Sequence, residues 1–303
     1  MFLSKQPIND HLSLALSSLN SLVSPNAQLD LCSIPTSQKQ LSRLIDQESF
    51  KTFSTQFGVL DKARLLCCAM PHASAWIRAL PTKQNKLSAS EWVISMKRWL
   101  GVPFFNSEHL CCACKNEAMD VFAIHASVCP VSGDRIKRHN AIRDCFFDSC
   151  SAACWGPIKE KPFLLPGSSE KPADILIPNY SGGKDLAIDF AVTCPLQSKY
   201  LRDSAITSGH ACNSYALEIK SNNFEQRVQQ QNMEYLPIIL ETFGGFSSES
   251  LVFINKLTNS ISLRYSESRA SCANSFFEKV SCLLMKLLAR SISSRFEEFS
   301  HDQ

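Results

Sequence analysis

The sequence predicts a mixed α/β protein in which a helical module and a small cysteine–histidine segment precede a core of helices and strands. Three observations predict it. Apolar residues recur at helical spacing through residues 38–100. Cysteine and histidine residues at zinc-ligand spacing follow in residues 111–129. From residue 133 onward, helical patterns flank strand-like apolar runs, and a turn cluster separates the clearest two of these runs within residues 171–197.

Composition indicates a globular chain of 303 residues, because a hydrophobic content of 45% is enough for a core. There are fourteen cysteines, but charged residues interrupt residues 1–22, and a secretory signal is not expected there. We therefore expect a nuclear or cytoplasmic protein, not secreted, whose cysteines are free or metal-bound. No apolar run approaches the ~20 residues of a membrane span. A formal net charge of +3 leaves any nucleic-acid binding to local basic patches.

The N-terminal third shows no visible chemistry. Residues 1–36 are rich in Ser, Asn, Leu and Pro, which predicts a loosely ordered lead-in. Residues 37–105 carry Leu and Trp at helical spacing and are broken by Pro71, Pro81 and Pro103, which predicts a module of several short helices.

Chemistry begins in residues 106–132, where the spacing is Cys111-x2-Cys114-x10-His125-x3-Cys129. Thiolates and imidazole at such intervals are the ligands of a zinc knuckle. Cys112 is too close to Cys114 to form the usual chelate loop, so we take it as a neighbour. Four protein ligands leave no open position, hence the zinc would be structural. The alternative is a set of buried cysteines beside a hydrogen-bonded histidine.

A helix is predicted from the cap Ser132-Gly133-Asp134 to about Ala153. Its apolar face would hold Ile136, Ile142, Cys145, Phe146, Ser149 and Ala153. Its first half carries the basic residues Arg135, Lys137, Arg138, His139 and Arg143. A basic helix end suits a nucleic-acid phosphate backbone, although a solvated charged face is an equally ordinary reading.

Two carboxylates face each other in the predicted hairpin. Its turn centre falls between Ser181 and Gly182, and Asp174 and Asp189 are equally distant from that point. Directly opposed residues have Cβ atoms ~4.5–5.5 Å apart. Such carboxylates repel unless a divalent cation, Mg²⁺ or Mn²⁺, lies between them or one is protonated. The hairpin therefore predicts a metal site, and two solvated acids are the alternative.

The remaining core elements follow from local patterns. Residues 158–165 can form a strand carrying Glu160, and residues 198–232 form one or two helices with Gly209 at the weak point. Residues 235–243 form a further strand. Two helices end the chain, and the last is amphipathic, which favours packing over partner recognition.

The order helix, three strands, helix, strand resembles the PD-(D/E)XK, or restriction-endonuclease-like, nuclease core. The motif residues are Pro172-Ala173-Asp174, with an inserted alanine, and Asp189. Ala191 stands where that motif has its lysine.

A narrower resemblance covers residues 62–245. The knuckle, the Arg138-His139-Asn140 step, the string Leu165-Pro166-Gly167-Ser168 and the two acids are together similar to the restriction-enzyme-like endonuclease region C-terminal to non-LTR retrotransposon reverse transcriptases. In that family the catalytic lysine lies in the helix after the third strand, and Lys220 matches it. Asn223 and Phe224 replace a lysine and a tyrosine that are usual there. The polymerase motif Tyr-x-Asp-Asp does not occur, so we expect a detached C-terminal segment of such an element.

The resemblance implies a metal-dependent DNA endonuclease. Asp174 and Asp189 would hold Mg²⁺ or Mn²⁺, Glu160 would complete the site, and Lys220 would stabilise charge on the phosphate, with Lys184 or Lys199 as the next candidates. DNA, or RNA of the parent element, would be the partner, with no membrane and no small-molecule substrate. A second hypothesis is a nucleic-acid-binding module whose nuclease site has decayed, and a third is a protein-interaction module using the C-terminal helices.

Overall fold

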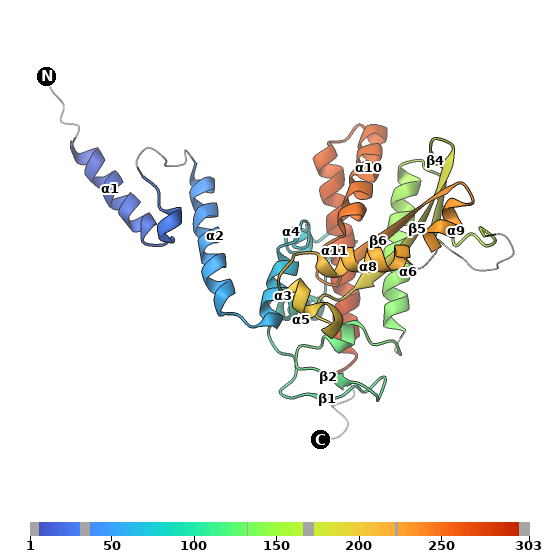
Figure 1. Cartoon of the computed structure of the whole chain (residues 1–303), viewed down its shortest axis with the longest axis horizontal. Coiled ribbons are helices and arrows are strands. Elements are labelled where there is room, and N and C mark those ends of the chain that lie inside the picture. The colour runs from blue at the N-terminus through green and yellow to red at the C-terminus, as the bar shows by residue number, and fades with distance from the viewer. Residues whose placement is uncertain (1–5, 31–36, 132, 166–172, 222–223, 297–303) are drawn as a thin grey trace. The chain divides into compact units, whose positions relative to one another are not determined.

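The computed structural model describes residues 6–30, 37–131, 133–165, 173–221 and 224–296 (Figure 1). The chain divides into two compact units, residues 1–58 and residues 59–303. The division falls at Gly58, inside the stretch of residues 37–105 that we expect to form one helical module.

The first unit contains α1 (Gln6–Asn20), the 3-10 turn η1 (Pro25–Ala27) and α2 (Gln38–Gln56). Glu48 of α2 is 4% exposed and ties the turn to the helix. Its carboxylate accepts the Ser24 hydroxyl at 2.5 Å and the Ser24 N–H at 3.3 Å. Within residues 6–30 the structure therefore has a helix and a turn held by Glu48, in the stretch that we expect to be loosely ordered.

The second unit begins with three helices, α3 (Val59–Cys68), α4 (Ala75–Arg78) and α5 (Ala89–Leu100). A capping box of Ser88 and Glu91 starts α5, and Gly101 in the left-handed region ends it. The knuckle follows, with β1 (His109–Leu110), β2 (Ala118–Met119) and the 3-10 turn η2 (His125–Ser127). These helices confirm the short elements that the prolines predict.

A four-stranded mixed sheet forms the centre of this unit, after helix α6 (Asp134–Ala152). The strands are β3 (Ile158–Lys159), β4 (Ile175–Ser181), β5 (Lys184–Thr193) and β6 (Met233–Glu241). They lie in the order β3-β4-β5-β6, and only β5 and β6 run parallel. The parallel pair is connected through α7 (Ser198–Ser204), α8 (His210–Ser221) and α9 (Phe224–Gln229), with Gly209 at the break between α7 and α8. The mixed α/β class is confirmed.

The strand predicted over residues 158–165 is much shorter than expected. Only Ile158 and Lys159 pair with β4, and Glu160 has a φ of 42°. Left-handed backbone ends the extended conformation, and Pro162 has no N–H to donate to a continued ladder. Glu160 therefore lies just beyond the strand.

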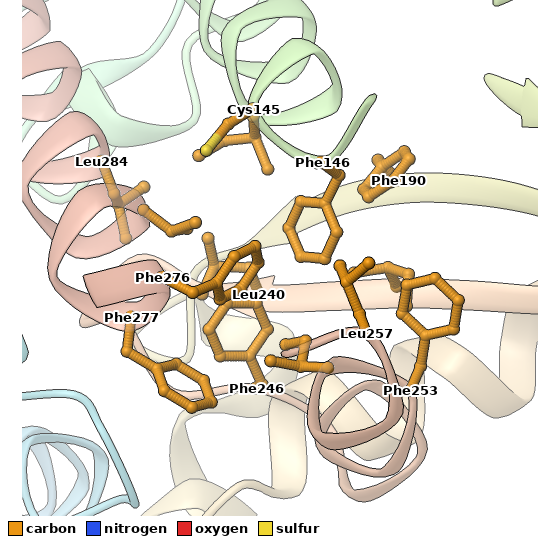
Figure 2. Packing of buried hydrophobic residues seen from close by; sticks show 14 of the residues in the cluster. Cys145, Phe146, Phe190, Leu240, Phe246, Phe253, Leu257, Phe276, Phe277 and Leu284 are labelled. Carbon is orange, nitrogen blue, oxygen red and sulfur yellow. The ribbon is translucent and has the colours of Figure 1, made fainter. Parts of the chain in front are cut away.

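The main core lies on one face of the sheet, against α6, α10 (Ser248–Tyr265) and α11 (Arg269–Ser293). Figure 2 shows Phe146 of α6 and Phe190 of β5 among the aromatic residues of this cluster, with ring centroids 4.9 Å apart. The apolar side of α11, including Phe276 and Leu284, is buried here. The apolar side of α11 therefore packs inside this unit, as its amphipathic pattern favours. The prediction that Ile136 lies on the apolar face of α6 is wrong, because its side chain is 65% exposed.

The opposite face of the sheet packs against α8 and α9 through smaller clusters that include Leu176, Ala187, Ala216 and Val228. Strand alternation divides β5 as predicted: Leu186, Ile188 and Phe190 enter the main core, whereas Ala187 faces the other side. Asp189 is two residues from Ala187 in β5 and therefore lies on the same face of the strand. Both predicted acids therefore belong to the face that carries α8.

The hairpin turn lies one residue beyond its predicted centre. Ser181 pairs with Lys184, which leaves Gly182 and Gly183 as the loop, with φ of 57° and 80°. Positive φ at both positions is what a type I′ turn requires. The register then shifts between Ile177 and Ser181, so that Ile175 pairs with Ile188. This shift restores the predicted pairing and places Asp174 beside Asp189.

Candidate functional site

The four predicted knuckle ligands converge on one point. The ligand atoms of Cys111, Cys114, His125 and Cys129 all lie within 4.8 Å of one another. The sulfurs of Cys111 and Cys129 are 4.0 Å apart, and Cys114 Sγ is 3.4 Å from His125 Nε2. A tetrahedral ion with Zn–S bonds of ~2.3 Å separates two thiolates by ~3.8 Å. The cluster therefore fits the size and donor set of zinc, and it can hold that ion.

The backbone around these ligands is fixed by local hydrogen bonds. The Asp120 carboxylate accepts the N–H groups of Phe122 and Ile124 at 3.0 Å and that of His125 at 2.9 Å. Asp120 thus fixes the backbone that carries the His125 imidazole. On the other side, the Asn116 N–H lowers the pKa of the Cys114 thiol to about 6, which favours the thiolate that a metal needs. Burial raises the pKa of Cys129, and a bound cation would counter that effect.

A buried arginine lies against the knuckle. Arg295, at the end of α11, is 3% exposed and its guanidinium is 3.4 Å from Asp134 at the start of α6. Burial would lower the pKa of Arg295, but Asp134 and the thiols of Cys111 and Cys129 outweigh it and raise the pKa. Three thiolates and Zn²⁺ carry a net charge of −1. The Arg295 guanidinium, which also pairs with Asp134, would lie beside that charge in an occupied site.

The second cluster is the acid pair, which we define as Asp174 and Asp189. Asp174 is the residue before β4, and Asp189 lies in β5. His139 Nε2 of α6 lies 2.9 Å from Asp174 Oδ1, and the Phe190 N–H donates to Asp174 Oδ2 at 2.8 Å. The Tyr235 hydroxyl of β6 donates to Asp189 Oδ2 at 3.3 Å. Both carboxylates are thus held by groups from different elements.

These contacts shift the pKa values of the two acids in opposite directions. Burial would raise the pKa of Asp174, but the hydrogen bonds from His139 and the Phe190 N–H outweigh it and lower the pKa. Burial and the neighbouring Asp174 carboxylate raise the pKa of Asp189 to about 7. The bond to Asp174 raises the pKa of His139. Asp189 is the acid that gives up a proton when a cation approaches.

Glu160 does not join the acid pair as a third ligand. Its carboxylate pairs with Arg143, although its N–H donates to the Asp174 carbonyl at 2.9 Å. Within the described ranges, the knuckle is the only group of three or more metal-ligating side chains. Glu160 therefore does not complete a three-carboxylate cluster with Asp174 and Asp189.

The predicted lysines differ in what the structure says of them. Lys220 lies in α8, on the correct face of the sheet, but its side chain is outside the described residues. Lys199 Nζ pairs with Glu218 at 2.6 Å, and Lys184 is exposed beside the hairpin turn. Asn223 is likewise outside the described residues. Lys199 is engaged elsewhere and is a poor substitute for Lys220.

The basic residues of α6 fall into two groups. Arg135 and Lys137 are exposed, as a surface that contacts phosphates requires. Arg138 is 2% exposed and donates to the Ser127 carbonyl of the knuckle at 2.7 Å, while its Nε and Nη1 atoms have no protein partner. Arg143 is 8% exposed and pairs with Asp144 and Glu160. Arg138, Arg143 and His139 therefore hold protein contacts where nucleic-acid contacts are predicted.

Tyr235, which donates to Asp189, is the residue beside the acid pair that sequence reasoning missed. It lies in β6, whose Pro237 pairs in parallel with Asp189. Residues two apart on a strand share a face. Knowing that Pro237 lies beside Asp189 would therefore have placed Tyr235 on the same face of the sheet as Asp189. That placement becomes readable only once the parallel register is known.

A pocket of about 420 Å³ opens beside the acid pair. Residues of α6, β5 and α8 line it, including Arg135, His139, Ala191 and Tyr215. Ala191 occupies the position at which the PD-(D/E)XK motif carries its lysine. The missing side chain leaves room at this wall.

Comparison with known proteins adds no assignment: no family model matches the chain, and no curated protein is significantly similar to it. None of the described helices combines the length and the apolar composition that crossing a bilayer requires.

Proposed function

We propose that this chain is a metal-dependent DNA endonuclease of the restriction-enzyme-like type, derived from the C-terminal region of a non-LTR retrotransposon reverse transcriptase. The observation that carries the proposal is the acid pair on neighbouring strands of a sheet whose element order is helix, three strands, helices, strand. The pair lies beside a pocket with an exposed arginine. Carboxylates at such a point are suited to a cation and a phosphodiester.

Asp174 and Asp189 would hold the Mg²⁺ or Mn²⁺ ion, which when bound lowers the pKa of water and neutralises phosphate charge. His139 and the Phe190 N–H orient the Asp174 carboxylate, and Tyr235 orients Asp189. Arg135 and Lys137 would contact phosphates without reading sequence. Lys220 remains the proposed cation for charge developing on the phosphate. The zinc of the knuckle would be structural.

The second candidate is a nucleic-acid-binding module without nuclease activity. Ala191 favours it, because the lysine of the PD-(D/E)XK motif is absent from that strand. A basic helix surface beside a zinc-binding segment would still bind a phosphate backbone.

A nicking assay on supercoiled DNA separates the two candidates. We expect wild type to nick the plasmid with Mg²⁺ or Mn²⁺ and not without divalent cation. Asp189→Asn and Asp174→Asn should abolish nicking while DNA binding stays intact or tightens, since each removes a negative charge near the phosphates. The matched control Asp148→Asn, an exposed acid on the same helix as His139, should nick like wild type. DNA binding by wild type without nicking would favour the second candidate.

A further inference from the structure

The pocket beside the acid pair has walls of two chemical kinds. Arg135, Arg138 and His139 of α6 bring basic groups, and Ile136 of the same helix brings an apolar one. Tyr215 of α8, which is half-buried, also lines the pocket. Ala191 of β5 contributes only a methyl group. The lining therefore combines basic groups with aromatic and aliphatic ones.

This pocket is continuous with the acid pair through two shared residues. His139 lines it and also contacts Asp174 at 2.9 Å. Phe190 lines it, and its N–H donates to the other oxygen of Asp174. Ala191 is two residues from Asp189, or ~6.6 Å along the strand. A polynucleotide with a phosphodiester at the acid pair would therefore have a neighbouring nucleotide within reach of the pocket.

The apolar part of the lining argues against a site for phosphate alone. A phosphate needs positive charge and N–H donors, which Arg135 would supply. A phosphate gains no binding free energy from the apolar side chain of Ile136. That side chain is 65% exposed, although the apolar spacing of α6 predicts that it is buried. A nucleobase has flat faces that pack against aromatic and aliphatic side chains. The volume of about 420 Å³ is also in the range of small-ligand pockets.

We propose that the pocket receives one unpaired nucleotide of a DNA strand, with its base against Tyr215 and Ile136 and its phosphate at Arg135. The proposal rests on the proposed nuclease function, because it names the substrate that the acid pair would act on. A base in duplex DNA must leave the stack to enter a pocket, at a cost that an unpaired base does not carry. The substrate class is therefore DNA with a single-stranded or unpaired nucleotide next to the cleaved bond.

Binding in the absence of divalent cation tests this without any cleavage. The probes are a fluorescent single-stranded 12-mer and a blunt hairpin duplex of the same sequence, measured by fluorescence anisotropy. We expect wild type to bind the single strand more tightly. Tyr215→Ala should weaken single-strand binding about 5- to 100-fold, as for loss of one stacked base, and leave duplex binding unchanged. Tyr215→Phe, which keeps the ring, should bind like wild type.

Arg135 and Lys137 provide a matched pair of charges on α6. Both are exposed, but only Arg135 lines the pocket. Arg135→Gln should weaken single-strand binding more than duplex binding, whereas Lys137→Gln should weaken both equally. Zinc content and the circular dichroism spectrum check that each variant is folded.

The outcomes separate this proposal from the proposed function. Equal binding of both probes, or equal losses for both probes in folded Tyr215→Ala, overturns the pocket assignment even if the plasmid is nicked. A loss confined to the single strand supports the pocket even if nicking is never seen. In that case the nuclease proposal falls and the base-binding site stands.

Discussion

Asp189 shows how strongly one side chain depends on its neighbours. Its carboxylate is buried beside Asp174, and its pKa is raised to about 7, far above that of a solvated aspartate. Between the unfolded pKa near 4 and the folded pKa near 7, the folded chain binds a proton that the unfolded chain has lost. The stability that this proton brings is complete below about pH 4 and is lost as the pH rises through 7.

We therefore predict that Asp189→Asn is more stable than wild type at pH 8 by on the order of 2 kcal/mol, because the variant has no carboxylate charge to bury beside Asp174 at that pH. At pH 4 the two proteins should differ little. Chemical denaturation at both pH values measures this. Magnesium added at pH 8 should stabilise wild type and not the variant. A constant difference between the two proteins at both pH values would mean that Asp189 does not titrate as described.

Substitutions of His139 test whether its contact with Asp174 affects the binding of the metal ion. Groups that orient a metal ligand typically change affinity 10–100-fold. We predict that His139→Ala raises the Mg²⁺ concentration for half-maximal nicking about 10- to 100-fold, whereas His139→Gln, which keeps an N–H donor, restores part of the loss. Zinc content should not change in either variant. A lower maximal rate with unchanged Mg²⁺ dependence would contradict a positioning role.

At the scale of elements, local patterns predicted types and order well and placement less well. The hairpin is instructive, because its predicted turn was one residue early and its predicted acid pairing was still right. The irregularity after Ile177, where Asn179 has a φ of 50°, compensates for the turn at Gly182 and Gly183. No residue pattern announces a bulge of this kind. The correct register was reached through two errors that cancel.

Long-range contacts explain the other differences. Arg138 and Arg143 were placed on the surface because charged side chains are ordinarily solvated. Their partners, the Ser127 carbonyl and Glu160, come from segments whose approach the local sequence does not reveal. Tyr235 was missed for the same reason. The knuckle ligands, by contrast, lie close together in sequence, and their spacing carried enough information.

The bulge supplies a prediction about register. The Asn179 N–H donates to the Asp185 carboxylate at 2.9 Å across the hairpin. Asp185→Ala removes an exposed hydrogen bond and should cost only about 0.5–1 kcal/mol of unfolding free energy. We expect the nicking rate to fall by more than this loss of stability would cause, because the bulge sets the position of Asp174. Retained stability together with full nicking would show that the register is fixed elsewhere.

The knuckle supplies a second prediction at this scale. Cys114→Ser should release zinc and unfold the segment, because binding free energy at a closed site is folding free energy. The adjacent Cys112→Ser is the control, since Cys112 is outside the ligand cluster and should keep zinc. Elemental analysis of protein purified without chelator measures both. A wild type without zinc would remove the basis of the structural-zinc assignment.

At the scale of the molecule, the hydrophobic clusters found among the described residues all belong to the second unit. We predict that residues 59–303 fold without residues 1–58, keep zinc and keep the activity of the full chain. Their melting temperature should lie within about 4 °C of the corresponding transition in the full chain, which corresponds to about 1 kcal/mol or less for a domain of this size. Calorimetry and the nicking assay check this. Aggregation or loss of zinc in the isolated unit would contradict this prediction.

Arg138 and His139 are consecutive residues of α6, yet one contacts the knuckle and the other contacts Asp174. If the knuckle holds Zn²⁺ and the acid pair holds Mg²⁺ as proposed, a shift of α6 would disturb both sites. An agent that sequesters zinc would inhibit a magnesium reaction from a distance, with an onset set by the slow release of zinc. Excess magnesium would not reverse that inhibition, whereas restored zinc would. Time-dependent inhibition of this kind distinguishes mechanical coupling between the two centres from simple competition at either one.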